Sequence, residues 1–189
     1  VAVSSSGTGN RVMTSPDGIT WTSRVSAADN TWNSVCYDIP MGLFVAVASS
    51  GIGNRVMSSP DGITWTSRFT LLDYEWTSIA KSSSLYVAVS NTKYVMTSTD
   101  SINWTIRSSD IDNSWTSICF DFGGDWVAVS TSGTGNRVMT SPDGITWTSR
   151  VSAVDNDWTS IFSDGSMMVA ISNTGTANRV MTSSDGITW

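Results

Sequence analysis

The chain has 189 residues, enough for one or two ordinary domains, and 40% of them are hydrophobic. Its net charge is −6 with no basic run, which argues against nucleic acid and against insertion into or binding to an anionic membrane. It contains no histidine, so the commonest general base and the commonest zinc ligand are missing. We therefore expect no metal and no cofactor.

The first part of the chain alternates β-prone runs with Gly-rich and polar links. In order, residues 1–24 hold a Val-Ala-Val strand at 1–3, a Gly-rich link at 6–10, an Arg-Val-Met-Thr strand at 11–14 and an Ile-Thr-Trp-Thr strand at 19–22. A polar linker then leads to a further strand at 32–37, which begins with Trp. No window has helical periodicity, so the chain is predicted to be all-β.

The same unit recurs along the whole chain at intervals of about 40 residues. The repeats lie approximately at 1–24, 32–68, 75–108, 114–150 and 157–189 of a single domain, 1–189. A full unit has four strands, in the order Trp-x-Ser-Ile, Val-Ala-Val, Arg-Val-Met-Thr and Ile-Thr-Trp-Thr. A period near forty with four strands is typical of β-propeller blades, which bury both faces only by stacking on neighbours. We predict a β-propeller of four-stranded antiparallel blades, with five blades.

The first repeat lacks the Trp-x-Ser-Ile strand that opens the other four. An incomplete blade exposes a sheet face and edge, which proteins usually cover. We expect the chain to be part of a longer protein, or another chain to supply the missing strand by exchange.

A Ser-x-Asp-Gly-x-Thr-Trp turn links the last two strands of each unit. In the first copy, Pro16 presets φ, Asp17 can cap its own backbone, and Gly18 accepts the left-handed conformation. We assign a structural role to Ser15, Asp17, Gly18, Trp21; Ser59, Asp61, Gly62, Trp65; Ser98, Asp100, Trp104; Ser141, Asp143, Gly144, Trp147; and Ser183, Asp185, Gly186, Trp189. The third copy is degenerate, with Ser101 and Asn103 where the others have Gly and Thr.

These turns resemble the Asp-box, or BNR repeat, of sialidases, Vps10-type receptor propellers and Ycf48-type photosystem assembly factors. All five copies depart from the usual pattern, which has one more residue between Asp and Gly. The resemblance implies a propeller in which the box lies on the blade periphery and serves architecture.

The resemblance to sialidases raises the possibility of a glycoside hydrolase. A sialidase needs three arginines on a carboxylate, a Tyr nucleophile with a Glu partner, and an acidic proton donor. All eight arginines occupy repeat positions, and the only glutamate, Glu75, lies in a linker. We therefore predict that the protein is not an enzyme and assign no catalytic residue.

The Gly-rich links and the polar linkers share one end of the propeller, because successive strands run in opposite directions. An Asp stands three residues before each Trp-x-Ser-Ile strand, and an Asn accompanies three of the four. Asp, Asn, exposed backbone and a nearby Trp suit a sugar site. The candidate ligand-binding residues are Asp29, Asn30, Asp73, Asp112, Asn113, Asp155, Asn156, Trp32, Trp76, Trp115 and Trp158. The alternative is that the Asp and Asn close Asx-turns and the tryptophans pack between blades.

Near-identical repeats suit repeated weak sites, in which avidity multiplies modest affinities. We predict a non-enzymatic, lectin-like binding or display module that recognises glycans or a protein partner, located outside the cell or on a cell or virion surface. The alternative is a purely structural repeat module of a larger surface or fibre protein. Cys36 and Cys119 occupy equivalent positions in different units and are expected to be free thiols.

Overall fold

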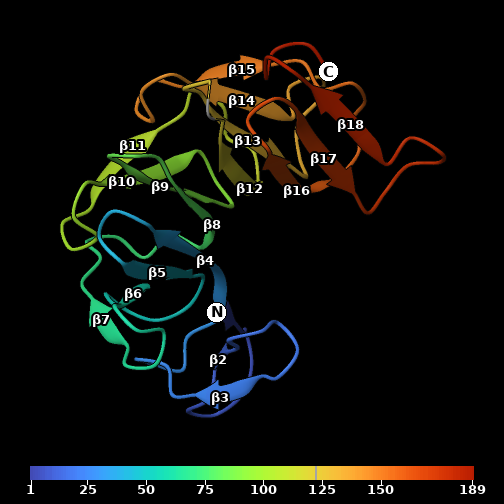
Figure 1. Cartoon of the computed structure of the whole chain (residues 1–189). Coiled ribbons are helices and arrows are strands. Elements are labelled where there is room, and N and C mark those ends of the chain that lie inside the picture. The colour runs from blue at the N-terminus through green and yellow to red at the C-terminus, as the bar shows by residue number, and fades with distance from the viewer. Residues whose placement is uncertain (122) are drawn as a thin grey trace.

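The computed structural model describes residues 1–121 and 123–189, which form five antiparallel sheets and no helix (Figure 1). The first sheet contains β1 (Ala2–Val3), β2 (Val12–Thr14) and β3 (Thr22–Arg24), and the second contains β4 (Trp32–Asp38), β5 (Leu43–Ala48), β6 (Val56–Ser59) and β7 (Thr66–Arg68). The third contains β8 (Trp76–Lys81), β9 (Tyr86–Ser90), β10 (Tyr94–Ser98) and β11 (Thr105–Ser108). The fourth contains β12 (Trp115–Phe120), β13 (Trp126–Ser130), β14 (Val138–Ser141) and β15 (Thr148–Arg150), and the fifth β16 (Trp158–Ser163), β17 (Met168–Ser172) and β18 (Val180–Ser183).

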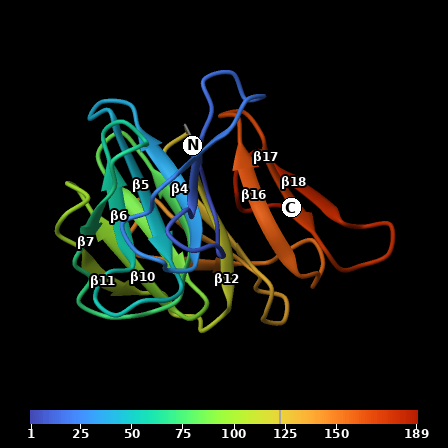
Figure 2. The same ribbon diagram turned by 90° about the horizontal axis from the view of Figure 1, so that it is seen from below.

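The five sheets stand along an arc, and the first and last sheets lie apart at its two ends (Figure 1). The view from below shows the second sheet in the body of the arc and the fifth sheet at one end (Figure 2). The strands that begin with Trp (β4, β8, β12 and β16) contact one another from sheet to sheet. Each therefore lies at the inner edge of its sheet, as expected for a propeller.

Hydrogen bonds between neighbouring inner strands fix the stacking of the sheets. Thr116 of β12 donates its hydroxyl to the backbone oxygen of Trp158 in β16, 2.6 Å away. The next residue, Ser117, accepts a hydrogen bond from the backbone N–H of Ile161 at 3.1 Å. The same two bonds link the third sheet to the fourth. The Trp-x-Ser-Ile pattern thus carries a contact between sheets as well as a strand.

The core lies between the sheets and has the same composition at each interface. The face toward the next sheet presents valines, such as Val87, Val89 and Val95 of the third sheet. The opposing face of the fourth sheet presents larger side chains, among them Trp115 and Met139. The other interfaces repeat this arrangement of valines against Trp, Ile, Ala and Met. Neither face of a single sheet is covered without a neighbour, and the burial of apolar area is the main force that holds the arc together.

Every Ser-x-Asp-Gly-x-Thr-Trp turn closes with the same hydrogen bonds. In the first copy Ser15 Oγ donates to Asp17 Oδ1 and accepts the N–H of Gly18 at 2.7 Å. Asp17 Oδ1 also accepts the N–H groups of Ile19 and Thr20 at 2.9 and 2.8 Å. The other four copies have equivalent bonds. The Ser hydroxyl, one Asp oxygen and the Gly N–H of the motif therefore make their hydrogen bonds within the turn itself.

The all-β prediction is confirmed, and the first sheet has no Trp-x-Ser-Ile strand at its inner edge, as predicted. The last strand of each unit differs from the prediction: the sequence places it at Ile-Thr-Trp-Thr, 19–22 in the first unit, but β3, β7, β11 and β15 all begin only at the Thr after the Trp. Residues 187–189 end at this Trp and contribute no strand, so the fifth sheet has three strands. The five sheets form an open arc, so the blade number of a closed ring stays a prediction. None of the described residues belongs to a helix that could cross a membrane.

Candidate binding surfaces

The two ends of the stacked sheets carry different connections, and we name them by these. The loop face carries the β1–β2, β5–β6, β9–β10, β13–β14 and β17–β18 loops and the links between sheets. The turn face carries the β4–β5, β8–β9 and β16–β17 turns and the Ser-x-Asp-Gly-x-Thr-Trp turns. The Asp and Asn residues predicted to bind a ligand come from the links, and the four tryptophans are the first residues of the strands that follow, so all of them lie toward the loop face.

On the loop face, the predicted Asp and Asn residues join the loops of consecutive sheets. Asp29 accepts the N–H of Gly9 in the first sheet at 2.7 Å, while Asn30 donates to the backbone oxygen of Asn54 in the second at 2.8 Å. Asp73, Asp112 and Asp155 accept backbone N–H groups of the preceding sheet in the same way. Asn113 and Asn156 donate to backbone oxygens of the sheet that follows. One link therefore ties two sheets together.

The four candidate tryptophans, Trp32, Trp76, Trp115 and Trp158, are buried in the interfaces between sheets. The indole N–H of Trp32 donates to the backbone oxygen of Ala28, and that of Trp158 to Val154. In this arrangement their ring faces pack on protein and offer no surface on which a sugar could stack. Ligand binding by the neighbouring Asp and Asn side chains stays a prediction.

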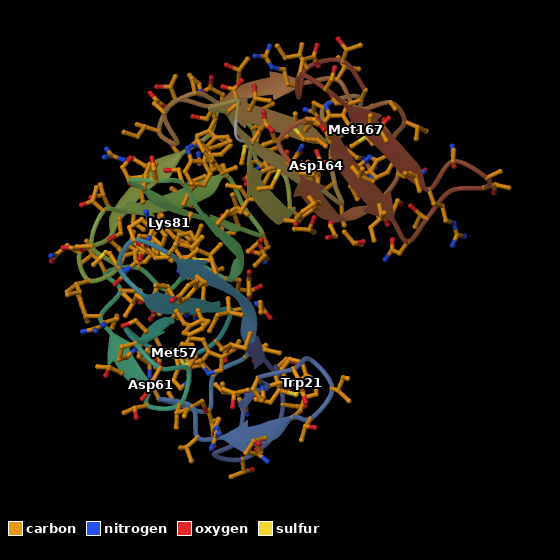
Figure 3. All side chains as sticks on the ribbon, viewed as in Figure 1. Trp21, Met57, Asp61, Lys81, Asp164 and Met167 are labelled. Carbon is orange, nitrogen blue, oxygen red and sulfur yellow. The ribbon has the colours of Figure 1, made fainter. Side chains whose placement is uncertain are left out.

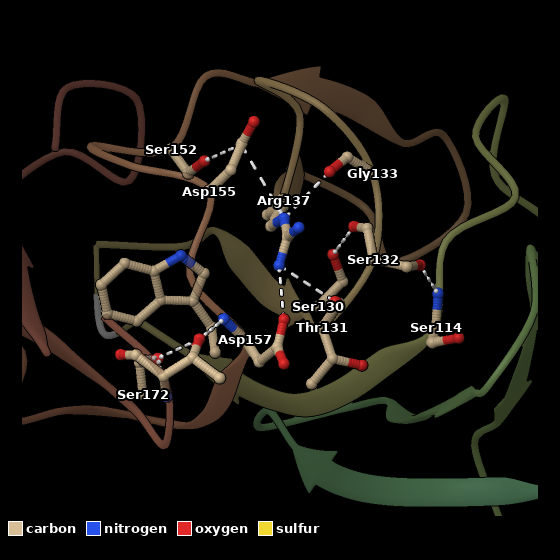
Figure 4. A network of polar contacts seen from close by, with 12 residues as sticks. Ser114, Ser130, Thr131, Ser132, Gly133, Arg137, Ser152, Asp155, Asp157 and Ser172 are labelled. Carbon is tan, nitrogen blue, oxygen red and sulfur yellow. Dashed lines mark hydrogen bonds and ion pairs between the residues drawn. The ribbon is translucent and has the colours of Figure 1, made fainter. Parts of the chain in front are cut away.

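Arg137 organises the loop face between the fourth and fifth sheets (Figure 4). Its guanidinium donates to the backbone oxygens of Gly133 and Thr131 at 2.9 and 3.0 Å. It also pairs with Asp157 at 2.8 Å and approaches Asp155 at 3.8 Å. Arg11 and Arg55 grip their own loops in the same way. Arg11, Arg55 and Arg137, which directly precede β2, β6 and β14, therefore hold their loops in place instead of projecting toward a ligand.

The turn face has a hollow that the sequence did not predict. It measures about 650 Å³ and is lined by Tyr37, Asp38, Ile39, Pro40, Lys81, Ser82, Ser83 and Phe120. A second hollow, of about 380 Å³, shares Ser82, Ser83 and Phe120 with it and reaches Ile145 of the fourth sheet. The two hollows adjoin at these shared residues and are lined by the second, third and fourth sheets. We call the pair the turn-face groove.

A buried ion pair forms one wall of the turn-face groove. Lys81 Nζ lies 3.4 Å from Asp38 Oδ2, and both side chains are buried. Lys81 also donates to the backbone oxygen of Ser82 and lies over the ring of Tyr86, whose hydroxyl donates to Asp38. Burial raises the pKa of Asp38, but the hydrogen bonds from Tyr86 and Met41 and the ammonium of Lys81 outweigh it and leave this pKa lowered.

The residues of this cluster differ from those at the equivalent positions of the other units. This departure from the repeat is the feature of the sequence that could have revealed the cluster. The residues that correspond to Lys81 at the ends of the other inner strands are Tyr37, Phe120 and Ser163. Between the fourth and fifth sheets the uncharged hydroxyl of Ser163 takes the place of the Lys81 ammonium and donates a 2.7 Å hydrogen bond to Asp121, the counterpart of Asp38. The eight arginines all occupy repeat positions, whereas Lys81 departs from the residues at the equivalent positions of the other units.

Cys36 and Cys119 are free, as predicted, and lie mostly buried beside the cores between sheets. Burial raises the pKa of each thiol to about 12, and nearby Asp38 and Asp121 add to the shift. Both remain protonated at neutral pH, and a thiol is a poor nucleophile in that state.

The five turn aspartates predict a loss of stability in acid. Hydrogen bonds, chiefly from the N–H three residues on, lower the pKa of Asp17, Asp61, Asp100, Asp143 and Asp185 from 3.8 to about 2. Since the folded pKa lies below the unfolded one, the stabilisation is complete above about pH 4 and is lost as the pH falls toward about 2. We expect the urea midpoint, followed by tryptophan fluorescence, to fall across that window. A midpoint unchanged from pH 5 to pH 2.5 would show that these bonds contribute nothing.

No protein-family model and no curated protein matches the chain. Among solved structures, the chain is similar to Ycf48 bound to a D1 peptide, with a TM-score of 0.60 and 18% identity over 89% of this chain and 58% of that one. It is similar to a chain of the nidogen/laminin complex, with a TM-score of 0.64 and 14% identity over 80% and 60% of the two chains. It is also similar to a virginiamycin B lyase from Staphylococcus aureus, with a TM-score of 0.67 and 11% identity over 86% of this chain and 59% of that one.

The chain thus spans less than two thirds of the length of these three structures. At such identities the likeness concerns the fold and not the ligand. Taken with the five stacked antiparallel sheets, it shows that this chain has a β-propeller fold.

Proposed function

We propose that the protein is a non-enzymatic, Asp-box-type propeller module that binds a protein partner through the turn-face groove. The observation that carries this proposal is the set of apolar side chains left exposed around the groove. Ile39, in the turn between β4 and β5, is 81% exposed, and Tyr37, near the end of β4, is 48% exposed. Large exposed apolar groups in a hollow are typical of interaction sites.

The shape of the groove favours an extended peptide segment over a compact ligand. Its two parts meet at Ser82 and Ser83, and aromatic rings stand on both sides of that junction. Tyr37 stacks against Phe44 with ring centroids 4.5 Å apart, and Phe120 packs against Trp126 at 4.8 Å. Rigid aromatic side chains of this kind anchor binding at low entropic cost. Two of the similar structures, Ycf48 with a D1 peptide and the nidogen/laminin complex, hold polypeptide partners, which agrees with the proposal.

The loop face is a second candidate, for multivalent recognition of glycans. In its favour, carboxylates of the links stay partly exposed: the side chains of Asp29, Asp155 and Asp157 are 43%, 38% and 40% exposed. Carboxylate oxygens of this kind accept hydrogen bonds from sugar hydroxyls. A glycan array followed by titration calorimetry tests this, and Asp155→Asn should weaken any binding found there, because it removes one of several equivalent sites. An array without hits would remove the glycan hypothesis.

The absence of enzymatic activity is part of the same proposal. It is supported by the direction of the pKa shifts, since every shifted carboxyl in the described part of the chain has a lowered pKa. A general acid of a glycoside hydrolase needs a raised one. Turnover of a sialoside or another glycoside by the purified chain would contradict the proposal.

Panning a phage-displayed random peptide library on the immobilised protein tests the protein-binding proposal. We expect enrichment of peptides with aromatic or aliphatic anchors, measured afterwards by fluorescence anisotropy. Ile39→Asp should weaken their binding about tenfold or more, because it places a charge in an apolar contact. Ile52→Asp is the matched control, since Ile52 is equally exposed but lies in the β5–β6 loop on the loop face.

Two results would count against the groove. Failure to enrich any peptide would favour the alternative of a purely structural repeat module. Binding that Ile39→Asp leaves intact and Ile52→Asp removes would move the site to the loop face.

A further inference from the structure

We propose that Asn103 is an N-glycosylation site, and that the first sugar of its glycan rests on an apolar patch beside the neighbouring second sheet. The glycan is added where the chain passes through a eukaryotic secretory pathway. The inference rests on two departures from the repeat that meet at one place on the outer side of the arc. It is independent of the turn-face groove and of any partner bound there.

The first departure is the triplet Asn103-Trp104-Thr105. It is the one Asn-x-Ser/Thr triplet in the 189 residues, and this pattern is the acceptor of N-linked glycans. Asn103 stands where the other four Ser-x-Asp-Gly-x-Thr-Trp turns have threonine. Because β11 begins only at Thr105, Asn103 belongs to the turn and not to a paired strand, and both Asn103 and Thr105 are exposed. The folded chain can therefore carry a sugar at this position.

The hydrogen bonds of the turn are compatible with a sugar on the Asn103 side chain. Asn103 Nδ2 donates to Asp100 Oδ2 at 2.8 Å, and the backbone N–H of Asn103 donates to Asp100 Oδ1 at the same distance. A carboxamide nitrogen carries two protons, so one N–H is enough for this contact. In the transfer, Nδ2 loses the other proton and bonds to C1 of the sugar. The bond from C1 to the lipid-linked diphosphate of the donor breaks, and its electron pair leaves with the diphosphate.

The second departure is the apolar patch, which consists of Phe69 and Leu71 on the link after the second sheet. Their exposed fractions are 71% and 72%. In the other units the residues at the position of Phe69 are Val25, Ser108 and Val151, and those at the position of Leu71 are Ala27, Asp110 and Ala153. This link therefore exposes larger apolar side chains than its counterparts do, and an exposed patch of this kind is typical of a contact surface.

Asn103 and the patch line the same hollow. It measures about 400 Å³, with Phe69 and Leu71 on one side and Asn103 and Trp104 on the other. The strands beside it, β7 and β11, lie on the outer side of the arc (Figure 1). Figure 3 shows side chains that project outward from this side. A sugar ring packs its apolar face on aromatic and aliphatic groups and keeps its hydroxyls in water. A glycan attached at the rim of this hollow thus brings the surface that the patch fits.

Expression of the chain with a secretion signal in cultured insect or mammalian cells tests the acceptor site. Intact mass before and after treatment with peptide-N-glycosidase F shows whether a glycan is attached, and chains from the medium and from the cells are both measured. We expect a glycan on the parent chain and on Thr105→Ser, which keeps the acceptor triplet. Thr105→Val has the shape of the parent without the hydroxyl and should carry none. A parent chain without a glycan in either fraction would overturn the proposal.

The contact with the patch is tested on chains whose high-mannose glycans have been trimmed to a single sugar by endoglycosidase H. We expect a higher urea midpoint, followed by tryptophan fluorescence, than for the same chain made without the sugar in bacteria. Phe69→Ser, which introduces the residue that the next link has at Ser108, should remove most of this gain. Val151→Ser is the matched control, since Val151 is also 71% exposed at the equivalent place of another link, and it should leave the gain intact. A sugar that gives no gain, or a gain that Phe69→Ser leaves unchanged, would show that the glycan does not rest on the patch.

Discussion

Replacing Gly144 by alanine is expected to destabilise the protein far more than the same change at Gly18, although the two glycines have the same place in their turns. Their φ angles are +71° and +75°, a region that costs an L-residue about 1–2 kcal/mol. This strain is common to both substitutions. Any difference between them must come from what the new methyl group meets.

At Gly144 a Cβ would lie 2.8 Å from Leu85 Cδ2 and 2.9 Å from Val87 Cγ2. Both belong to the third sheet, and Val87 is fully buried. At Gly18 the Cβ would meet nothing within 4 Å, since none of the described sheets packs on that side of the turn. Overpacking of this kind costs about 1–3 kcal/mol beyond the strain. We expect Gly18→Ala to lower the free energy of unfolding by about 1–2 kcal/mol, and Gly144→Ala by that amount and the overpacking cost together.

Urea denaturation followed by tryptophan fluorescence measures both changes. The third sheet provides an internal comparison, since Ser101 occupies this position with a φ of +63°. A side chain is thus compatible with the turn where its surroundings allow it. Equal losses at Gly144 and Gly18 would show that the fourth sheet can move away from the third, and that the sheets are less tightly stacked than the core indicates.

The fold could be predicted from the sequence because each of the five repeats has apolar residues on both faces of its sheet, and these are buried only between neighbouring sheets. The Trp-x-Ser-Ile and Val-Ala-Val strands were placed correctly because their apolar residues have to alternate between two neighbours. The last strand of each unit was placed too early, because the Ile and Trp of the Ile-Thr-Trp-Thr pattern belong to the turn: the indole N–H of Trp21 donates to the backbone oxygen of Gly18, and β3 begins only at Thr22. Residue pattern carries the propensity for a strand, but the hydrogen bonds of the turn decide where pairing begins.

The candidate site was harder to predict, because the sequence shows which side chains can form hydrogen bonds but not whether a ligand or the protein's own backbone is their partner. Asp29 and Asn30 have the chemistry of a sugar site, yet the loops on either side of their link take up their inward-facing groups. Likewise, the sequence suggests Trp158 as a surface on which a sugar could stack, but in the structure Trp158 is buried in an interface between sheets. The turn-face groove arises from three sheets that meet, and no single repeat contains enough of it to be recognised.

Replacing Lys81 by methionine is expected to have the largest effect of any single change outside the apolar core. It removes the ammonium 3.4 Å from Asp38 and leaves that carboxylate buried without a counter-charge. Breaking a buried pair from one side costs about 3–5 kcal/mol. Lys93→Met is the matched control: Lys93 is exposed and pairs with no carboxylate among the described residues, so a change within about 0.5 kcal/mol is expected.

A double-mutant cycle separates the ion pair from the loss of the lysine side chain. Asp38→Asn removes the charge and keeps one of the two acceptor oxygens, because Oδ1 accepts the N–H of Met41 and Oδ2 accepts the hydroxyl of Tyr86. With the amide oxygen toward Met41, the amide nitrogen can donate to the Tyr86 hydroxyl. The double variant should therefore recover most of the stability that Lys81→Met loses, with a coupling of about 1–3 kcal/mol. The deficit of Lys81→Met should also shrink in acid, since protonation of Asp38 removes the unpaired charge. If Lys81→Met is as stable as the parent at pH 7, then water reaches Asp38 and this wall of the turn-face groove is open to solvent. In that case the groove would have to bind its partner by charge instead of by apolar contact.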